Sequence, residues 1–148
     1  MHSTGLVISL GTLLAGASVV TLEQRSFDAH ELFSVVERRR VTAVSIVGDA
    51  FALPILRALD EAAEAGQSYD TSSLRSMFSA GVAWSAPVKS RLLDHIPQLM
   101  LLDACGATDG GVYGVQLTKT TESTTQCQAT WDVSRPTAPL RCSGGAPR

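Results

Sequence analysis

The sequence predicts an α/β fold in which a parallel sheet is covered by helices, followed by an irregular C-terminal tail. Along the first hundred residues, segments with helical spacing of apolar side chains alternate strictly with short runs of strand-forming residues. Strict alternation of this kind is typical of parallel strands joined by crossover helices. Of the 148 residues, 45% are hydrophobic, which is enough to bury the core of one domain or of part of a larger one.

The N-terminal segment predicts a buried helix over residues 2–15 and a buried strand over Ser18–Leu22. The helix is indicated by apolar residues three and four positions apart: Leu6, Val7, Leu10, Leu13 and Leu14. The uncharged stretch Gly5–Leu22 leaves an export signal open as an alternative, with cleavage near Ala15-Gly16-Ala17. However, no Lys or Arg precedes the stretch, and its glycines and hydroxyl side chains make a poor membrane span. We therefore predict no integral membrane segment and a cytoplasmic protein.

The second helix and the next strand are predicted between Ser26 and Val47. Ser26 or Asp28 is the expected N-cap, and the basic run Arg38–Arg40 suits the C-terminal end of a helix dipole. The run Val41–Val47 is uncharged and rich in β-branched residues, as in a strand that is buried on both faces.

Two further helices and a strand between them continue the alternation. Asp49 is the expected cap of a helix over Phe51–Ala65, which leads to a strand over Leu74–Phe78. Ser85 is the expected cap of the next helix, Pro87–Ile96, because proline is favoured at the first helical positions.

The last predicted strand, Gln98–Leu102, leads into a turn over Cys105–Gly110. In parallel sheets ligands bind beyond the carboxyl ends of the strands. Gly48-Asp49, Ser79–Gly81 and Cys105–Gly110 each follow a predicted strand, so we expect these three segments at the same edge of the sheet.

Charge and cysteine content exclude several classes of function. The net charge is −2 and no basic stripe is present, which argues against nucleic acid as a partner. Three irregularly spaced cysteines and three distant histidines argue against a disulfide scaffold and against a zinc site.

The segment 119–148 differs in composition from the rest of the chain. It is rich in Thr, Ser, Pro and Gly, and its large apolar side chains are few, namely Trp131, Val133 and Leu140. Such a segment buries too little surface to offset its chain entropy, so we expect a disordered or non-homologous tail.

Two short segments hold candidate ligand-binding residues. In Gly106–Gly110, Thr108 can donate its hydroxyl to a phosphate oxygen and Asp109 can ligate Mg²⁺, while Gly106 permits close approach of a ligand to the backbone. Taken alone, an Asp-Gly pair after a strand is more often a plain turn. The small residues of Ser79–Ala83 can admit a flat ring against the backbone, or can simply form a tight connection.

Together these segments resemble the AMP-forming acyl-CoA synthetases, which are fatty-acid–CoA ligases of the adenylate-forming superfamily. His2–Gly5 is similar to the end of the family's PLxHxxG element, and Leu74–Ala83 is similar to its LRxxxSGGA strand and loop. Asp103–Asp109 is similar to its DxYGxTE element. The resemblance spans about residues 1–118, which we predict to be a partial AMP-binding domain at the N-terminal side of such an enzyme.

The resemblance implies an adenylate site and its substrates. In this family ATP and a fatty acid or related carboxylate give an acyl-adenylate and pyrophosphate, and CoA then displaces AMP. Gly81, Val82 and Ala83 would line the adenine and acyl pocket, and Asp103 would approach the adenine amino group. Cys105 and Gly106 would complete the nucleotide-binding segment.

The same resemblance assigns the catalytic residues. Thr108 would contact the phosphate, and Asp109 would hold the Mg²⁺ ion that neutralises charge during adenylyl transfer. Two residues depart from the family pattern: Cys105 replaces the aromatic ring that stacks on adenine, and Asp109 replaces a glutamate. The shorter side chain draws the ligand back by roughly 1 Å or more.

Other family elements are expected outside the resembling segment. The phosphate loop would precede residue 1, and the ribose-binding Asp, the hinge and the C-terminal domain with its catalytic Lys would follow residue 118. From about Gln126 the composition is typical of translation in a shifted frame. We therefore expect a fragment that is inactive alone, from a truncated or decayed gene, with a non-catalytic remnant or a nucleotide- or partner-binding module as the alternative. Intact coding sequence in frame on both sides would contradict this.

Overall fold

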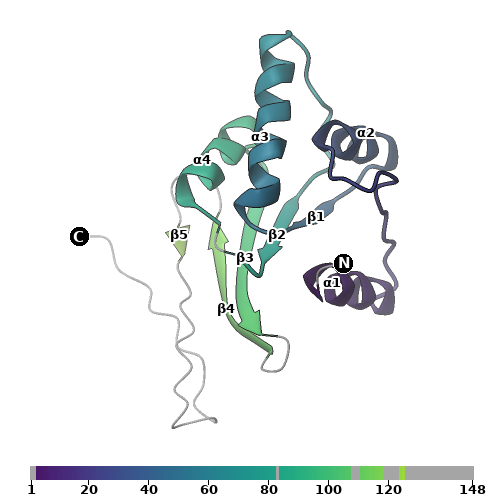
Figure 1. The fold of residues 1–148 in the computed structure, drawn as a ribbon, viewed down its shortest axis with the longest axis vertical. Helices are drawn as coiled ribbons and strands as arrows, with labels where there is room; N and C mark the ends of the chain where they lie inside the picture. Colours follow the sequence, from purple (N-terminus) through teal and green to yellow (C-terminus); the bar gives the residue numbers. More distant parts are fainter. Residues whose placement is uncertain (1–2, 83, 108–110, 119–123, 126–148) are drawn as a thin grey trace, which may run out of the picture.

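The structure is a computed structural model that describes residues 3–82, 84–107, 111–118 and 124–125. The helices of this part are α1 (Ser3–Leu14), α2 (Ala29–Arg39), α3 (Asp49–Glu64) and α4 (Ala86–His95). The strands are β1 (Ala43–Ile46), β2 (Ser76–Ala80), β3 (Met100–Ala107), β4 (Gly111–Thr118) and β5 (Thr124–Thr125). Figure 1 shows how they are arranged.

The strands form one sheet in the order β1-β2-β3-β4-β5. β1, β2 and β3 are parallel, as predicted, and α3 and α4 connect them. β4 was not predicted: it pairs antiparallel with β3 and turns the end of the sheet into a hairpin. The predicted turn from Cys105 was wrong in its start, because pairing with β4 continues β3 through Ala107.

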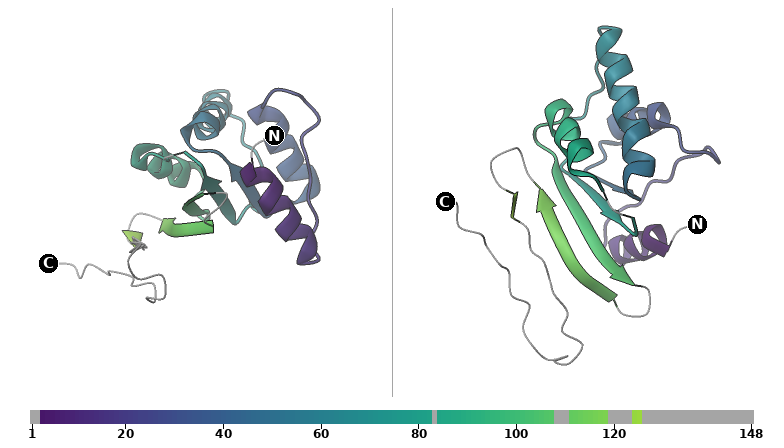
Figure 2. Two further views of the ribbon diagram at one scale, coloured as in Figure 1. Left: turned by 60° about the horizontal axis from the view of Figure 1, so that its bottom comes forward. Right: turned by 60° about the vertical axis from the view of Figure 1, so that its left-hand side comes forward.

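Helices α2, α3 and α4 lie over one face of the sheet (Figures 1 and 2). The side chains that point from the sheet to these helices include Val44, Met77 and Leu101, which are neighbours in the strand register. They join one core with the inner faces of the helices, formed among others by Phe33, Val36, Ile55, Leu56, Leu92 and Ile96. Burial of β1 on both faces was a wrong prediction, because Ala43 and Ser45 are exposed.

The ends of α2 agree with the sequence prediction. Asp28 is the N-cap, and its carboxylate accepts the backbone N–H of His30 at 2.8 Å. The helix ends at the arginine run, where Arg40 takes the left-handed conformation with φ 51°. Cationic side chains at this position interact favourably with the negative, C-terminal end of the helix dipole.

The N-terminal segment departs from its prediction. Helix α1 forms, but it lies beside β1 and its leucines are exposed, up to 80% for Leu14. Residues 18–22 form no strand, and none of the strands in the described part of the chain pairs with them. Within the described residues, no helix combines the length and apolar character needed to cross a bilayer.

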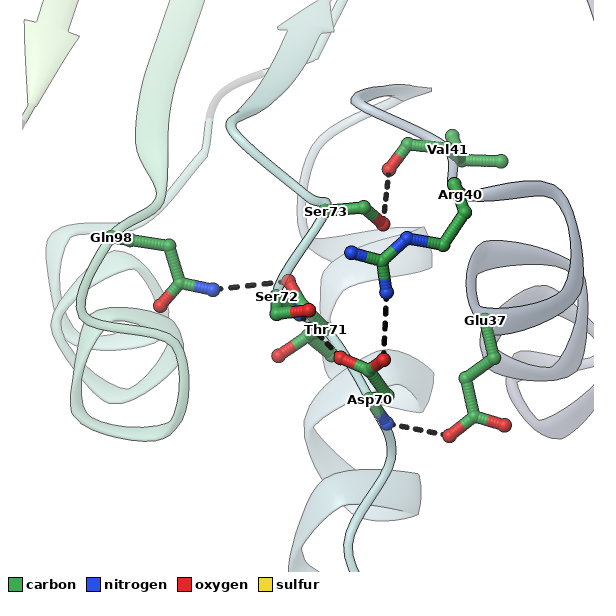
Figure 3. A network of polar contacts seen from close by, with 8 residues as sticks. All are labelled: Glu37, Arg40, Val41, Asp70, Thr71, Ser72, Ser73 and Gln98. Atoms are coloured by element: carbon green, nitrogen blue, oxygen red, sulfur yellow. Dashed lines mark hydrogen bonds and ion pairs between the residues drawn. The ribbon is translucent and has the colours of Figure 1, made fainter.

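A polar network holds the segment that leads into β2 in place, at the edge of the sheet where the parallel strands begin (Figure 3). Arg40 Nη1 donates to Asp70 Oδ2 at 2.7 Å, and the backbone N–H of Asp70 donates to Glu37. The side-chain amide of Gln98 donates to the carbonyl of Thr71 at 3.0 Å. These bonds join the loop before β2 to α2 and to the start of β3, so we assign this network to folding.

A second polar cluster joins α3 to α4. Asp60 on α3 accepts from Arg91 Nη2 at 2.5 Å and from His95 Nε2 at 2.9 Å, which lie one turn apart on α4. The hydrogen bond from Arg91, followed by that from His95, holds the pKa of Asp60 below its usual value. The ionised carboxylate therefore stabilises the fold, and this contribution is lost as the pH falls through the lowered pKa.

We predict that Asp60→Asn makes the acid sensitivity of the fold smaller. Below about pH 4, the usual pKa of Asp, the wild-type chain loses the cluster while the variant has none to lose. Because 35% of the Asp60 side chain is exposed, we expect a difference of only about 0.5 kcal/mol in the free energy of unfolding. Urea unfolding at pH values from 6 to 3 measures it, with Asp94→Asn on α4 as the control. Equal acid sensitivity of wild type and Asp60→Asn would contradict this role.

Candidate functional site

The loops that follow β1 and β2 meet the middle of β3 at the carboxyl edge of the parallel strands. In the register, Ile46 lies beside Ser79 and Ser79 lies beside Asp103. This row faces the helices, one step beyond the apolar row of Val44 and Met77. On β2 and β3 the helix-facing surface therefore changes from apolar, at Met77 and Leu101, to polar, at Ser79 and Asp103. The segments expected to share this edge lie there as far as the structure describes them. That they form a ligand-binding site stays a prediction.

A buried hydrogen bond joins the ends of β1 and β2. The backbone N–H of Gly48 donates to Ser79 Oγ at 2.9 Å, and Ser79 is fully buried. Gly48 has φ 54° and ψ −154°, a conformation that is almost confined to glycine. The tight bend turns the chain directly from β1 into α3.

Asp49 has a different role from the predicted one. Gly48 is the N-cap of α3, and Asp49 is already its first residue. Its Oδ1 atom accepts the backbone N–H of Ser85 at 3.0 Å, just before α4 begins. Asp49 thus ties the connection after β2 to α3, while Ser85 is the N-cap of α4 as predicted.

A buried cation, Lys89, contacts both β3 and the connection between β2 and α4. Lys89 on α4 is only 4% exposed, and its Nζ atom lies 3.0 Å from Asp103 Oδ2 on β3. The same atom lies 5.5 Å from the ring centroid of Trp84, within the range of a cation–π contact. Trp84 is buried, and its indole N–H has no acceptor among the described residues. Packing and the Lys89 cation therefore hold the ring.

The structure brings together those predicted site residues that it describes. Gly81 has φ 93° and Val82 is 55% exposed, so the loop after β2 presents backbone and a small surface to solvent. Asp103 lies on β3 and is engaged by Lys89. Cys105 and Gly106 are also in β3, where the register with β4 shifts between them. Ala83, Thr108 and Asp109 lie outside the described residues.

Three contributors to this edge were missed in the sequence, namely Lys89, Trp84 and the hydroxyl of Ser79. A lysine on the inward face of a helix, between apolar neighbours at positions 88 and 92, was the available signal for a buried cation. Its partner is fourteen positions away on another element, so no local spacing identifies it.

The described carboxylates at this edge are used by the protein itself. Asp49 accepts from Ser85 and Asp103 accepts from Lys89. Among the described residues, no group of three or more His, Cys, Asp or Glu side chains could hold a metal ion. The assignment of Asp109 as a magnesium ligand stays a prediction.

The AMP-binding enzyme family matches residues 1–139 of the chain. A match of this extent shows that the chain belongs to the AMP-binding enzymes. The matched range includes part of the segment after residue 118, so the domain boundary at that residue stays a prediction.

Several relatives within this family are CoA ligases. A 3-oxocholest-4-en-26-oate–CoA ligase of Rhodococcus rhodochrous is 32% identical over 105 residues, which are 70% of this chain and 19% of the relative. A probable CoA ligase of Humulus lupulus is 33% identical over 110 residues, or 73% of this chain and 19% of that protein. The chain thus spans about a fifth of the length of these curated relatives.

Solved structures confirm the fold. A long-chain-fatty-acid–CoA ligase from Archaeoglobus fulgidus superposes with a TM-score of 0.66 at 16% identity, over 77% of this chain and 23% of the other. A luciferase-like enzyme from the mealworm Zophobas morio gives a TM-score of 0.64 at 20% identity, over 76% and 24%. The predicted partial N-terminal domain of an adenylate-forming enzyme is thereby confirmed as the fold class.

We predict opposite effects for the same substitution at two glycines. Gly48→Ala forces a Cβ into a conformation reserved for glycine and is expected to lower the free energy of unfolding by about 1–3 kcal/mol. Gly11→Ala lies inside α1, where an added Cβ meets no atom within 4 Å. It is expected to stabilise the helix by about 0.5–1 kcal/mol. Urea unfolding measures the first effect and helical circular dichroism the second.

The pair also provides its own control, because each variant adds the same methyl group. A neutral Gly48→Ala would contradict the assigned role of the bend that joins β1 to α3.

Proposed function

We propose that this chain forms the adenine side of the AMP-binding site of a fatty-acid–CoA ligase. One observation carries the proposal: the loop after β2 lies beside the part of β3 that leads to Cys105 and Gly106. Ala80 and Ala104 are partners in the register, so Gly81 and Val82 follow β2 directly next to this segment. A flat base can lie against such an exposed glycine backbone while Asp103 accepts a hydrogen bond from its amino group.

The substrates belong to the same proposal. The CoA-ligase relatives support CoA and a fatty acid or steroid carboxylate as substrates. Membership of the AMP-binding enzymes supports ATP as the third substrate. We assign the phosphate contact to Thr108 and a magnesium ligand to Asp109, which would neutralise charge on the transferred group. Gly81, Val82 and Ala83 would line the adenine and acyl pocket, and we place the protein in the cytoplasm.

We further propose that residues 1–148 alone do not catalyse the ligase reaction. Adenylyl transfer depends on electrostatic stabilisation of the phosphates by several groups at once. The described residues provide one such cation at this edge, Lys89, and it is paired with Asp103. The alternative is a non-catalytic remnant, or a module that binds a nucleotide or a partner.

We predict weak binding of the adenine moiety without turnover. AMP and adenosine are expected to raise the melting temperature of residues 1–148, whereas ribose 5-phosphate is not. A tenfold excess over Kd corresponds to about 1.4 kcal/mol of stabilisation. Exchange of radioactive pyrophosphate into ATP with a panel of fatty acids is expected to stay at background, with a full-length homologous ligase as the positive control.

The two measurements separate the proposals. Robust pyrophosphate exchange would contradict the lack of catalysis. A melting temperature that neither AMP nor adenosine changes would contradict the adenine site and favour the inert remnant.

A further inference from the structure

One buried ammonium group touches both segments of the proposed site. Lys89 reaches Asp103 on β3, two residues before Cys105, and the ring of Trp84, two residues after Val82. Its side chain comes from α4, which belongs to neither segment. The Lys89 ammonium group therefore connects β3 to the end of the loop after β2.

The burial of this charge makes the link specific. An ammonium group removed from water is strongly disfavoured unless an opposite charge and further polar contacts compensate it. Lys89 and Asp103 have side chains that are 6% and 19% exposed, so solvent screens their attraction far less than it screens a surface pair. Breaking the contact would separate two charges that solvent reaches poorly, so the contact favours one arrangement of the two side chains.

The geometry of the pair leaves a function for the second carboxylate oxygen. Lys89 contacts Oδ2, so Oδ1 is the oxygen with which Asp103 can accept a hydrogen bond from a ligand. A carboxylate that is already held in place loses little freedom when it accepts such a bond. It favours a base with an amino donor and disfavours a base with a carbonyl acceptor at the same position.

We propose that Lys89 is a positioning residue that gives the site its preference for an amino-bearing purine. This inference rests on the proposed function, because it assumes that the base lies between the loop after β2 and Asp103. Lys89 orients the Asp103 carboxylate and holds Trp84 behind the loop, and does not itself contact the base. A residue that serves packing alone would change stability without changing the choice between bases.

The test compares the affinities for AMP and IMP, which differ in having an amino or a carbonyl group at this ring position. Trp131→Phe provides the background, because it leaves Trp84 as the one tryptophan of the chain. The variants are Lys89→Met, Lys89→Arg and the double variant Lys89→Met with Asp103→Asn. Lys119→Met, which removes the only other lysine, is the matched control.

We expect the preference for AMP over IMP to fall about tenfold in Lys89→Met, as for the loss of one hydrogen bond to a charged group. Lys89→Arg is expected to keep most of the preference, and Lys119→Met to keep all of it. The emission maximum of Trp84 is expected to shift in Lys89→Met, because the cation leaves the ring. Calorimetric titration and fluorescence measure these effects.

The double variant guards against misfolding, because replacing both partners leaves no buried charge unpaired. Should Lys89→Met not fold, the same loss of preference is expected in the double variant. An unchanged preference in the folded variants would overturn the role of Lys89 while leaving the adenine site intact. Absence of AMP binding by the wild-type chain would instead contradict the proposed function, and the role of Lys89 with it.

Discussion

The architecture follows from one constraint: parallel neighbours in a sheet cannot be joined by a tight turn. Each connection must cross back over the sheet, and right-handed crossovers that proceed in one direction place their helices on the same face. The order β1-β2-β3 obliges α3 and α4 to share that face, where the core includes Met77 and Leu101 and the partly buried Val44. Both crossovers begin at the same edge. The position of the loops there, next to Ser79 and Asp103, is a consequence of the connectivity.

The sequence was sufficient for elements whose signals are local. Helical spacing and end residues predicted α2, α3 and α4, and alternation predicted the parallel strands that connect them. Prediction from the sequence failed where the structure of a segment depends on the elements packed or paired with it. The leucines of α1 have the spacing of a buried face, yet the described residues place no partner over them. β4 escaped prediction because glycines interrupt its apolar pattern, and pairing with β3 compensates for their weak strand preference.

In the candidate site, too, local sequence signals were predictable and contacts between distant elements were not. The segments after β2 and along β3 were recognised from their short motifs and from their expected place at the strand ends. The bonds that set their geometry were not, since Gly48 to Ser79 and Lys89 to Asp103 join residues on different elements. Asp49 shows the difference clearly: its sequence context indicates a helix cap, but its carboxylate binds the chain before the following helix. Only the packed fold determines which of several possible donors a carboxylate meets.

The entropic cost of pairing strands differs across the sheet: it is lower for the β3–β4 hairpin than for the parallel pairs. Only residues 108–110 separate these two strands, whereas the partners of β1 and β2 are about thirty residues apart in the chain. Loop-closure entropy thus favours the antiparallel side, and the parallel side depends on the docking of whole helices. Asp103 belongs to the side that is easier to form, while Lys89 arrives with a crossover helix. The chain therefore need not bury the Lys89 ammonium group before the carboxylate that receives it is in place.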